Sequence, residues 1–155
     1  METKNTTTEM AVAEIELVYR SKVKASERPK INSSKDAYDI FLKSWNADKI
    51  EFVEQFKILL LNRGNKVLGV YAVSTGGVTG TVADPRLIFV AALKANACAI
   101  ILSHNHPSSN LKPSNADEQL TFKMKEGGKL LDIQILDHLI ISAEGYYSMA
   151  DEGLL

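Results

Sequence analysis

The segment from Cys98 to Gly128 reads CAIILSHNHPSSNLKPSNADEQLTFKMKEGG and has the pattern of a strand, a polar loop and a helix. Its first part, CAIILS, is a short continuous apolar run, which is typical of a strand buried on both faces. Its last part, SNADEQLTFKMKEGG, predicts a helix that Gly127 and Gly128 close. A buried strand followed by a helix indicates an α/β or α+β fold, in which helices cover a mixed sheet.

The flanking sequence continues this alternation of strands and helices. Ser33, Ser34 and Asp84 are of the types that cap the first free amides of a helix, and Pro85 suits a first helical position. A turn at Asn62–Asn65 between two apolar runs indicates a hairpin. We expect helices in INSSKDAYDIFLKSW (31–45) and PRLIFVAALKANA (85–97). We expect strands on both sides of the turn in EQFKILLLNRGNKVLGVYAVSTGG (54–77), in IQILDHLIIS (133–142) and in GYYSMA (145–150). VAEIELVYR (12–20) is also expected to form a strand, with a helix as the alternative.

The composition is that of a soluble protein. A length of 155 residues, with 45% hydrophobic and 24% charged residues, suits one domain with a short appendage. The net charge of −1 provides no general positive field for nucleic acid or acidic lipid. A single cysteine excludes an internal disulfide and a cysteine-based zinc site. The first twenty residues lack the apolar core of a signal peptide, and no apolar run is long enough to cross a membrane. We therefore expect a cytoplasmic protein without membrane association.

The chain divides into an N-terminal extension and one folded domain. Residues 1–30 are polar and end in a basic linker, so we expect a partly flexible extension with a frayed start at residues 1–9. Residues 31–155 contain the other patterned elements and form the expected domain. STGGVTG (74–80) is rich in glycine but lacks the Gly-Lys-Ser/Thr ending of a phosphate-binding loop, so we interpret it as a connection.

His104 and His106 follow the buried strand and are separated by one residue. In an extended chain such residues point to the same side, whereas on a helix they would be about 200° apart. Pro107 ends ladder hydrogen bonding and places the pair at an exposed strand end. Two neutral imidazoles there predict a metal site, with Asp117 in the next helix as the candidate third ligand. Zinc suits two histidines and an aspartate, although iron or manganese also fit.

A metal-free explanation of these residues is open as well. Ser114 and Asp117 have the spacing of a capping box, which alone accounts for both residues at a helix start. The two histidines would then belong to a polar turn. His138 lies in an apolar run, where a hydrogen-bonded core histidine is expected ahead of a metal ligand.

The segment HNHPSSNLKPSNAD (104–117) resembles the JAMM signature of the MPN/JAB metalloprotease fold, which reads His-X-His-Pro, six residues, Ser, two residues, Asp. Every fixed position of the signature is present. The sequences DPRLIFVAALKANACAIILSHNHPS (84–108) and LLDIQILDHLIIS (130–142) are similar to those of the RadC group within this fold. The similarity extends over residues 31–155. The resemblance implies a single MPN/JAB-like domain, with a mixed β-sheet flanked by helices in a three-layer arrangement like that of cytidine deaminases.

The resemblance also implies roles for individual residues. His104, His106 and Asp117 would bind one zinc ion, or another divalent metal. Ser114 would stabilise the oxyanion of a tetrahedral intermediate. A glutamate from a preceding strand would act as general base. Glu54 has the position that RadC-like sequences give to this glutamate, while the residue pattern by itself does not separate Glu54 from Glu51.

The function implied by the resemblance is a zinc-dependent hydrolase of the JAMM type, which cleaves a peptide or isopeptide bond with a metal-activated water. Its partner would be a peptide or protein substrate. A non-catalytic MPN-type interaction module is one alternative, and a DNA-repair-associated accessory protein of the RadC group is another. The net charge of −1 disfavours DNA binding. The segment before residue 30 is also too short for the helix-hairpin-helix-like region that usually precedes the JAB domain in full-length RadC proteins.

Overall fold

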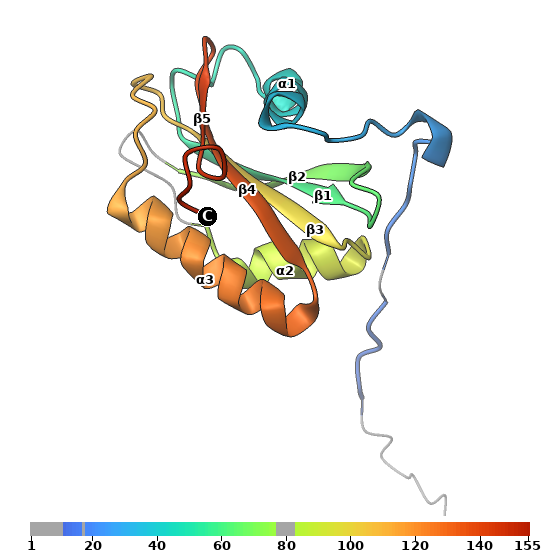
Figure 1. Ribbon diagram of the computed structural model, residues 1–155. Coiled ribbons are helices and arrows are strands. Elements are labelled where there is room, and N and C mark those ends of the chain that lie inside the picture. The colour runs from blue at the N-terminus through green and yellow to red at the C-terminus, as the bar shows by residue number, and fades with distance from the viewer. Residues whose placement is uncertain (1–10, 17, 77–82) are drawn as a thin grey trace, which may run out of the picture.

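A mixed β-sheet lies at the centre of the protein (Figure 1). The computed structural model describes residues 11–16, 18–76 and 83–155. Within these residues the strands are β1 (Gln55–Leu61), β2 (Val67–Thr75), β3 (Ala99–Asn105), β4 (Gln134–Ile141) and β5 (Tyr146–Ser148). They form one sheet in the order β2-β1-β3-β4-β5. β3 and β4 are parallel, and the other neighbouring pairs are antiparallel.

Helices cover both faces of this sheet. In the described part of the chain they are α1 (Ser34–Ser44), α2 (Pro85–Lys94) and α3 (Asn115–Leu131). The short 3₁₀ helix η1 (Ala25–Glu27) buries no residue and lies away from the sheet (Figure 1). α1 lies against one face, and α2 and α3 lie against the other (Figure 1). Side chains of β1 alternate between the two halves of the core, with Ile58 and Leu60 on the side of α2 and α3, and Leu59 and Leu61 on the side of α1. The predicted α/β fold with a mixed sheet between layers of helices is confirmed.

The helix starts and the hairpin follow the predicted local chemistry. Ser33 caps α1 by accepting a hydrogen bond from the Asp36 amide, and the Asp36 carboxylate accepts from the Ser33 amide in return. At the start of α2, the carboxylate of Asp84 accepts from the amide of Arg86. The turn between β1 and β2 begins at Asn62, whose carbonyl accepts from the amide of residue 65. These elements are determined by residues close together in the chain, and for that reason they were predictable.

The strand predicted for residues 12–20 is wrong. Residues 12–16 and 18–20 form neither a strand nor a helix, and the side chains of Val12 and Ile15 are 81% and 86% exposed. Tyr19 contacts the sheet with a hydroxyl that donates to the carbonyl of Leu68 at 3.0 Å. Alternating apolar residues form a strand only when an edge is available to pair with them, and no pairing partner of this segment occurs among the described residues.

The end of α3 also differs from the prediction. The helix continues through Gly127 and Gly128 to Leu131, and Asp132 ends it in the left-handed conformation with a φ of 53°. Gly128 lies where the chain passes from α3 toward β4, and a Cβ at this position would be 2.2 Å from the carbonyl oxygen of Ile133. Glycine is therefore required here for a close backbone approach, and it does not terminate the helix.

Two predicted features lie outside the described residues, wholly or in part. These are the frayed start at residues 1–9 and most of the STGGVTG connection, residues 77–80. No helix in the described part of the chain is long and apolar enough to cross a membrane.

Gly128→Ala is expected to lower the free energy of unfolding by about 1–3 kcal/mol, because the added methyl overlaps a backbone oxygen that can move only if the start of β4 moves. Gly127→Ala is the matched control. It brings the same gain in helix propensity, but its Cβ would meet the side-chain ring of Phe89, at 2.9 Å. Urea denaturation of both variants measures the difference. A Gly128→Ala protein as stable as Gly127→Ala would contradict the close approach at Ile133.

Candidate metal centre

The side chains of His104 and His106 lie on the same side of the sheet, at the end of β3. His104 lies within β3, and His106 directly follows it, with a backbone amide that still donates to the carbonyl of Ile141 in β4. The extended alignment therefore continues through His106, and the Nε2 atoms of the two rings are 3.0 Å apart. The prediction that both imidazoles face one direction is confirmed.

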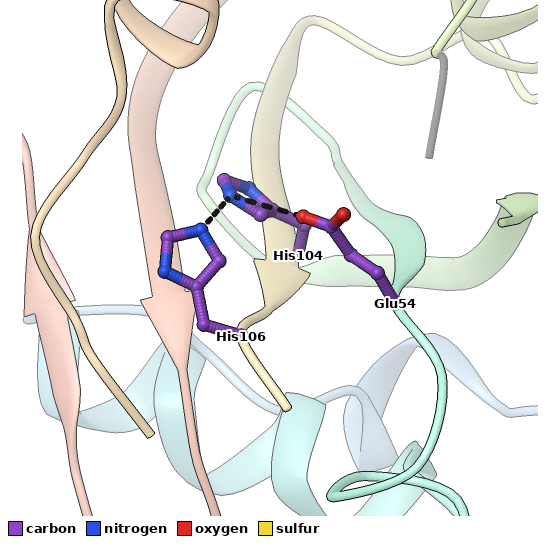
Figure 2. A group of neighbouring side chains, drawn as sticks. All are labelled: Glu54, His104 and His106. Carbon is purple, nitrogen blue, oxygen red and sulfur yellow. Dashed lines mark hydrogen bonds and ion pairs between the residues drawn. The ribbon is translucent and has the colours of Figure 1, made fainter. Parts of the chain in front are cut away.

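Glu54 reaches this pair from the start of β1. β1 and β3 are antiparallel, and Phe56 lies opposite His104, so the residue before β1 is next to the end of β3. Oε1 of Glu54 is 3.8 Å from Nε2 of His104, and the ligand atoms of Glu54, His104 and His106 all lie within 4.8 Å of one another. Figure 2 shows these three side chains converging from two segments of the chain. Glu51 is exposed to solvent in the turn before Glu54.

The carboxylate of Asp117 closes the cluster from α3. Its Oδ1 is 3.2 Å from Nε2 of His104, and its Oδ2 is 3.7 Å from Nε2 of His106. Oδ2 also accepts a hydrogen bond of 2.8 Å from the amide of Ser114, as the capping box predicts. The helix cap and the histidine contacts, which are rival explanations at the level of sequence, are therefore present together in one carboxylate.

Charge at the cluster favours a bound cation. Burial alone would raise the pKa of Asp117, but hydrogen bonds with His104 and His106 outweigh burial and hold this pKa well below its ordinary range. The hydrogen bond with Asp117 in turn raises the pKa of His106. Two imidazole nitrogens that face each other at 3.0 Å need a proton or a metal ion between them, because their lone pairs repel. The donor set of imidazole nitrogen and carboxylate oxygen fits zinc, and also iron or manganese.

Ser114 lies at the N-cap of α3 and is exposed to solvent. Its hydroxyl oxygen accepts from the amide of Asp117 at 3.1 Å. Among the described residues, no group accepts the hydroxyl hydrogen of Ser114. The same side chain can thus cap the helix and donate a hydrogen bond to a bound molecule.

Asn105 is a site residue that sequence reasoning missed. It is fully buried on the face of β3 opposite His104, and its amide nitrogen donates to the carbonyls of Ile50 and Val53. Its amide oxygen accepts from the amide of Gln55 at 2.7 Å. These three hydrogen bonds fix the segment that carries Glu54 beside His104. The sequence does contain a signal for this role: a polar residue stands between two histidines at the end of a buried strand. Because side chains alternate along a strand, this residue must point to the face opposite the histidines.

His138 in β4 is the hydrogen-bonded core histidine that the sequence predicts. It is fully buried, and its Nε2 is 2.7 Å from Nδ1 of His104. Burial lowers the pKa of His138 well below its ordinary value. Its Nδ1 is 2.6 Å from the hydroxyl of Thr121, a buried residue of α3 that sequence reasoning also missed.

The sequence of this chain is similar to those of known proteins. The sequence model described as RadC-like JAB domain matches residues 31–154. A UPF0758 protein of Flavobacterium johnsoniae is 47% identical over 125 residues, which cover 81% of this chain and 53% of that relative. A UPF0758 protein of Porphyromonas gingivalis is 48% identical over 103 residues, 66% of this chain and 45% of the relative. A UPF0758 protein of Clostridium kluyveri is 38% identical over 146 residues, 94% of this chain and 62% of the relative. The chain thus spans about half the length of the curated relatives it matches.

Asn105→Ala is expected to weaken the binding of a divalent metal at the cluster and to lower the free energy of unfolding by about 1–3 kcal/mol, because it leaves buried backbone groups near Glu54 without partners. Ser103→Ala is the control, since Ser103 is equally buried on the same face of β3 and its hydroxyl has no hydrogen-bond partner in the described structure. Zinc titration against a competing chelator and urea denaturation measure both effects. Equal zinc affinity in the two variants would show that Asn105 does not hold the site.

The lowered pKa of His138 predicts a pH-dependent stability of the metal-free protein. Below about pH 6.5 the unfolded chain takes up a proton at this histidine and the folded protein does not, so the stability contribution decreases as the pH falls, by up to about 1.4 kcal/mol per pH unit. The raised pKa of His106 acts in the opposite direction, so the comparison is between wild type and His138→Gln. Urea denaturation between pH 7.5 and 5.5, with a chelator present, measures the difference. The wild type is expected to lose more stability than the variant, and parallel pH profiles would contradict this.

Proposed function

Since the chain belongs to the family of RadC-like JAB domains, we propose that it is a zinc-dependent hydrolase that cleaves a peptide or isopeptide bond. The observation that carries the proposal is the convergence of two imidazoles and two carboxylates at the end of β3. These side chains come from three separate segments of the chain, and they share one small volume. The substrate class is an amide of a peptide or protein.

His104, His106 and Asp117 are the proposed ligands. Both histidines direct Nε2 to the same point, and Oδ1 of Asp117 faces it, while its Oδ2 is engaged in the helix cap. A bound zinc ion would act as a Lewis acid and lower the pKa of a water molecule toward about 7.

Glu54 is the proposed general base. Its side chain is 15% exposed, so it is held by the fold and still reachable by water and substrate. In this role the carboxylate takes the proton of the attacking water and passes it to the leaving amine. Ser114 donates its free hydroxyl hydrogen to the oxyanion that develops on the carbonyl oxygen. The exposed position of Ser114 next to Asp117 supports this role.

Metal analysis and peptide hydrolysis together test the proposal. Protein purified without added metal is expected to contain one zinc ion per chain, and His104→Ala and Asp117→Ala are expected to lose it. Glu54→Gln is expected to keep the metal and to lose at least about 100-fold in turnover of a peptide library, followed by mass spectrometry, because the base is removed and the proposed ligands remain. Glu51→Gln is the matched control, since Glu51 is exposed, and it is expected to behave as wild type.

Two results would contradict the proposal. Wild-type protein without stoichiometric metal, together with unchanged alanine variants, would overturn the metal centre and favour a non-catalytic interaction module. A loss of turnover in Glu51→Gln and not in Glu54→Gln would show that Glu51, and not Glu54, is the general base.

A further inference from the structure

A chain of hydrogen bonds leads from His104 into the core and returns to the first turn of α3. Nδ1 of His104 is 2.7 Å from Nε2 of His138, and Nδ1 of His138 is 2.6 Å from Oγ1 of Thr121. Oγ1 of Thr121 donates to the backbone carbonyl of Asp117 at 2.7 Å. The side chain of Asp117 then faces Nε2 of His104, so the circuit closes at His104, where it began. The metal centre itself gives no role to His138 or Thr121.

The direction of the hydrogen bonds follows from the number of protons available. A threonine hydroxyl has one hydrogen, and a backbone carbonyl can only accept. The hydroxyl of Thr121 is 2.7 Å from the carbonyl oxygen of Asp117 and 3.5 Å from Sδ of Met149, so we assign its hydrogen to the nearer acceptor, the carbonyl. The same hydroxyl oxygen then accepts from Nδ1–H of His138. A neutral His138 with its hydrogen on Nδ1 has a lone pair on Nε2. That lone pair accepts from Nδ1–H of His104.

This direction determines which nitrogen of His104 is available to a ligand. In a neutral His104 with its hydrogen held on Nδ1, the lone pair is on Nε2, and Nε2 is the atom that faces His106 and Asp117. The reverse direction would place the hydrogen of a neutral His104 on Nε2, where it blocks coordination. A hydrogen bond to the other ring nitrogen fixes the tautomer of a ligating histidine in this way.

Packing keeps the circuit rigid. His138 is fully buried, and the ring of Phe56 meets it edge-on at 5.6 Å between centroids. The same Phe56 ring stacks parallel to His104, at 5.9 Å and an interplanar angle of 3°. Phe56 and Thr121 are each 3% exposed, so both imidazole rings are oriented by packing against buried residues.

We propose that His138 and Thr121 are positioning residues for metal binding, which hold a hydrogen on Nδ1 of His104 and so present its Nε2 to a divalent cation. The proposal rests on the metal centre proposed above. It assigns a function to a histidine that local sequence identifies only as part of the core, and it extends the site to β4 and to the second turn of α3.

The tautomers can be read directly from long-range proton–nitrogen correlation spectra of uniformly ¹⁵N-labelled protein at pH 8. In both metal-free and zinc-loaded wild type, His104 is expected to carry a hydrogen on Nδ1, and His138 is expected to be neutral with its hydrogen on Nδ1. A hydrogen on Nε2 of His138 would overturn the proposal. This measurement on the wild type does not depend on the folding of any variant.

Zinc titration of two threonine variants tests the consequence. Thr121→Val has nearly the same shape but cannot accept from His138, so the tautomer of His138 is no longer fixed, and zinc affinity is expected to fall about 10–100-fold. Thr121→Ser keeps the hydroxyl and is expected to retain wild-type affinity and spectra. Equal zinc affinity in the two variants would overturn the role of the circuit and leave the metal centre intact. Wild-type protein that binds no zinc, but shows the expected tautomers, would overturn the metal centre and support the hydrogen-bond direction.

Discussion

Strand β3 is buried along its whole length, and successive side chains on it must point to opposite faces of the sheet. This constraint sends His104 toward α3 and Asn105 toward the opposite layer, one residue apart. On the first side, His104 meets Asp117 and His138. On the second, Asn105 binds the backbone that carries Glu54. The ligand pair and the segment that completes the site are thus arranged by a single strand, which pairs with antiparallel β1 on one side and parallel β4 on the other.

Much of the fold was predictable because its signals are local. The capping box at Ser33 and the turn at Asn62 need only a few neighbouring residues to form. The errors arise where tertiary contact decides. Residues 12–20 alternate like a strand but have no partner edge in the described structure, and the end of α3 depends on a close approach between Gly128 and Ile133 that spacing along the chain does not reveal.

The same distinction applies to the candidate site. The two histidines and Asp117 were found because a strand end and a helix start bring them together within fourteen residues of sequence. The choice of Glu54 over Glu51 required family resemblance, since their proximity to His104 depends on pairing across about fifty residues. Asn105 and Thr121 were missed for a related reason. Their importance lies in hydrogen bonds to groups distant in sequence, and an isolated asparagine or threonine in an apolar pattern has many ordinary explanations.

The antiparallel pairing of β1 with β3 also places the candidate metal site far from the point where the N-terminal segment joins the domain. β1 starts beside His104 and runs about 20 Å, at 3.3 Å per residue, to the hairpin turn at the far end of the sheet. At that far end the chain enters the domain, where Pro29 and Ile31 exchange backbone hydrogen bonds with the hairpin. A change in hairpin length therefore alters the end of the sheet opposite the histidines. A segment ahead of residue 29 joins the domain at that same end.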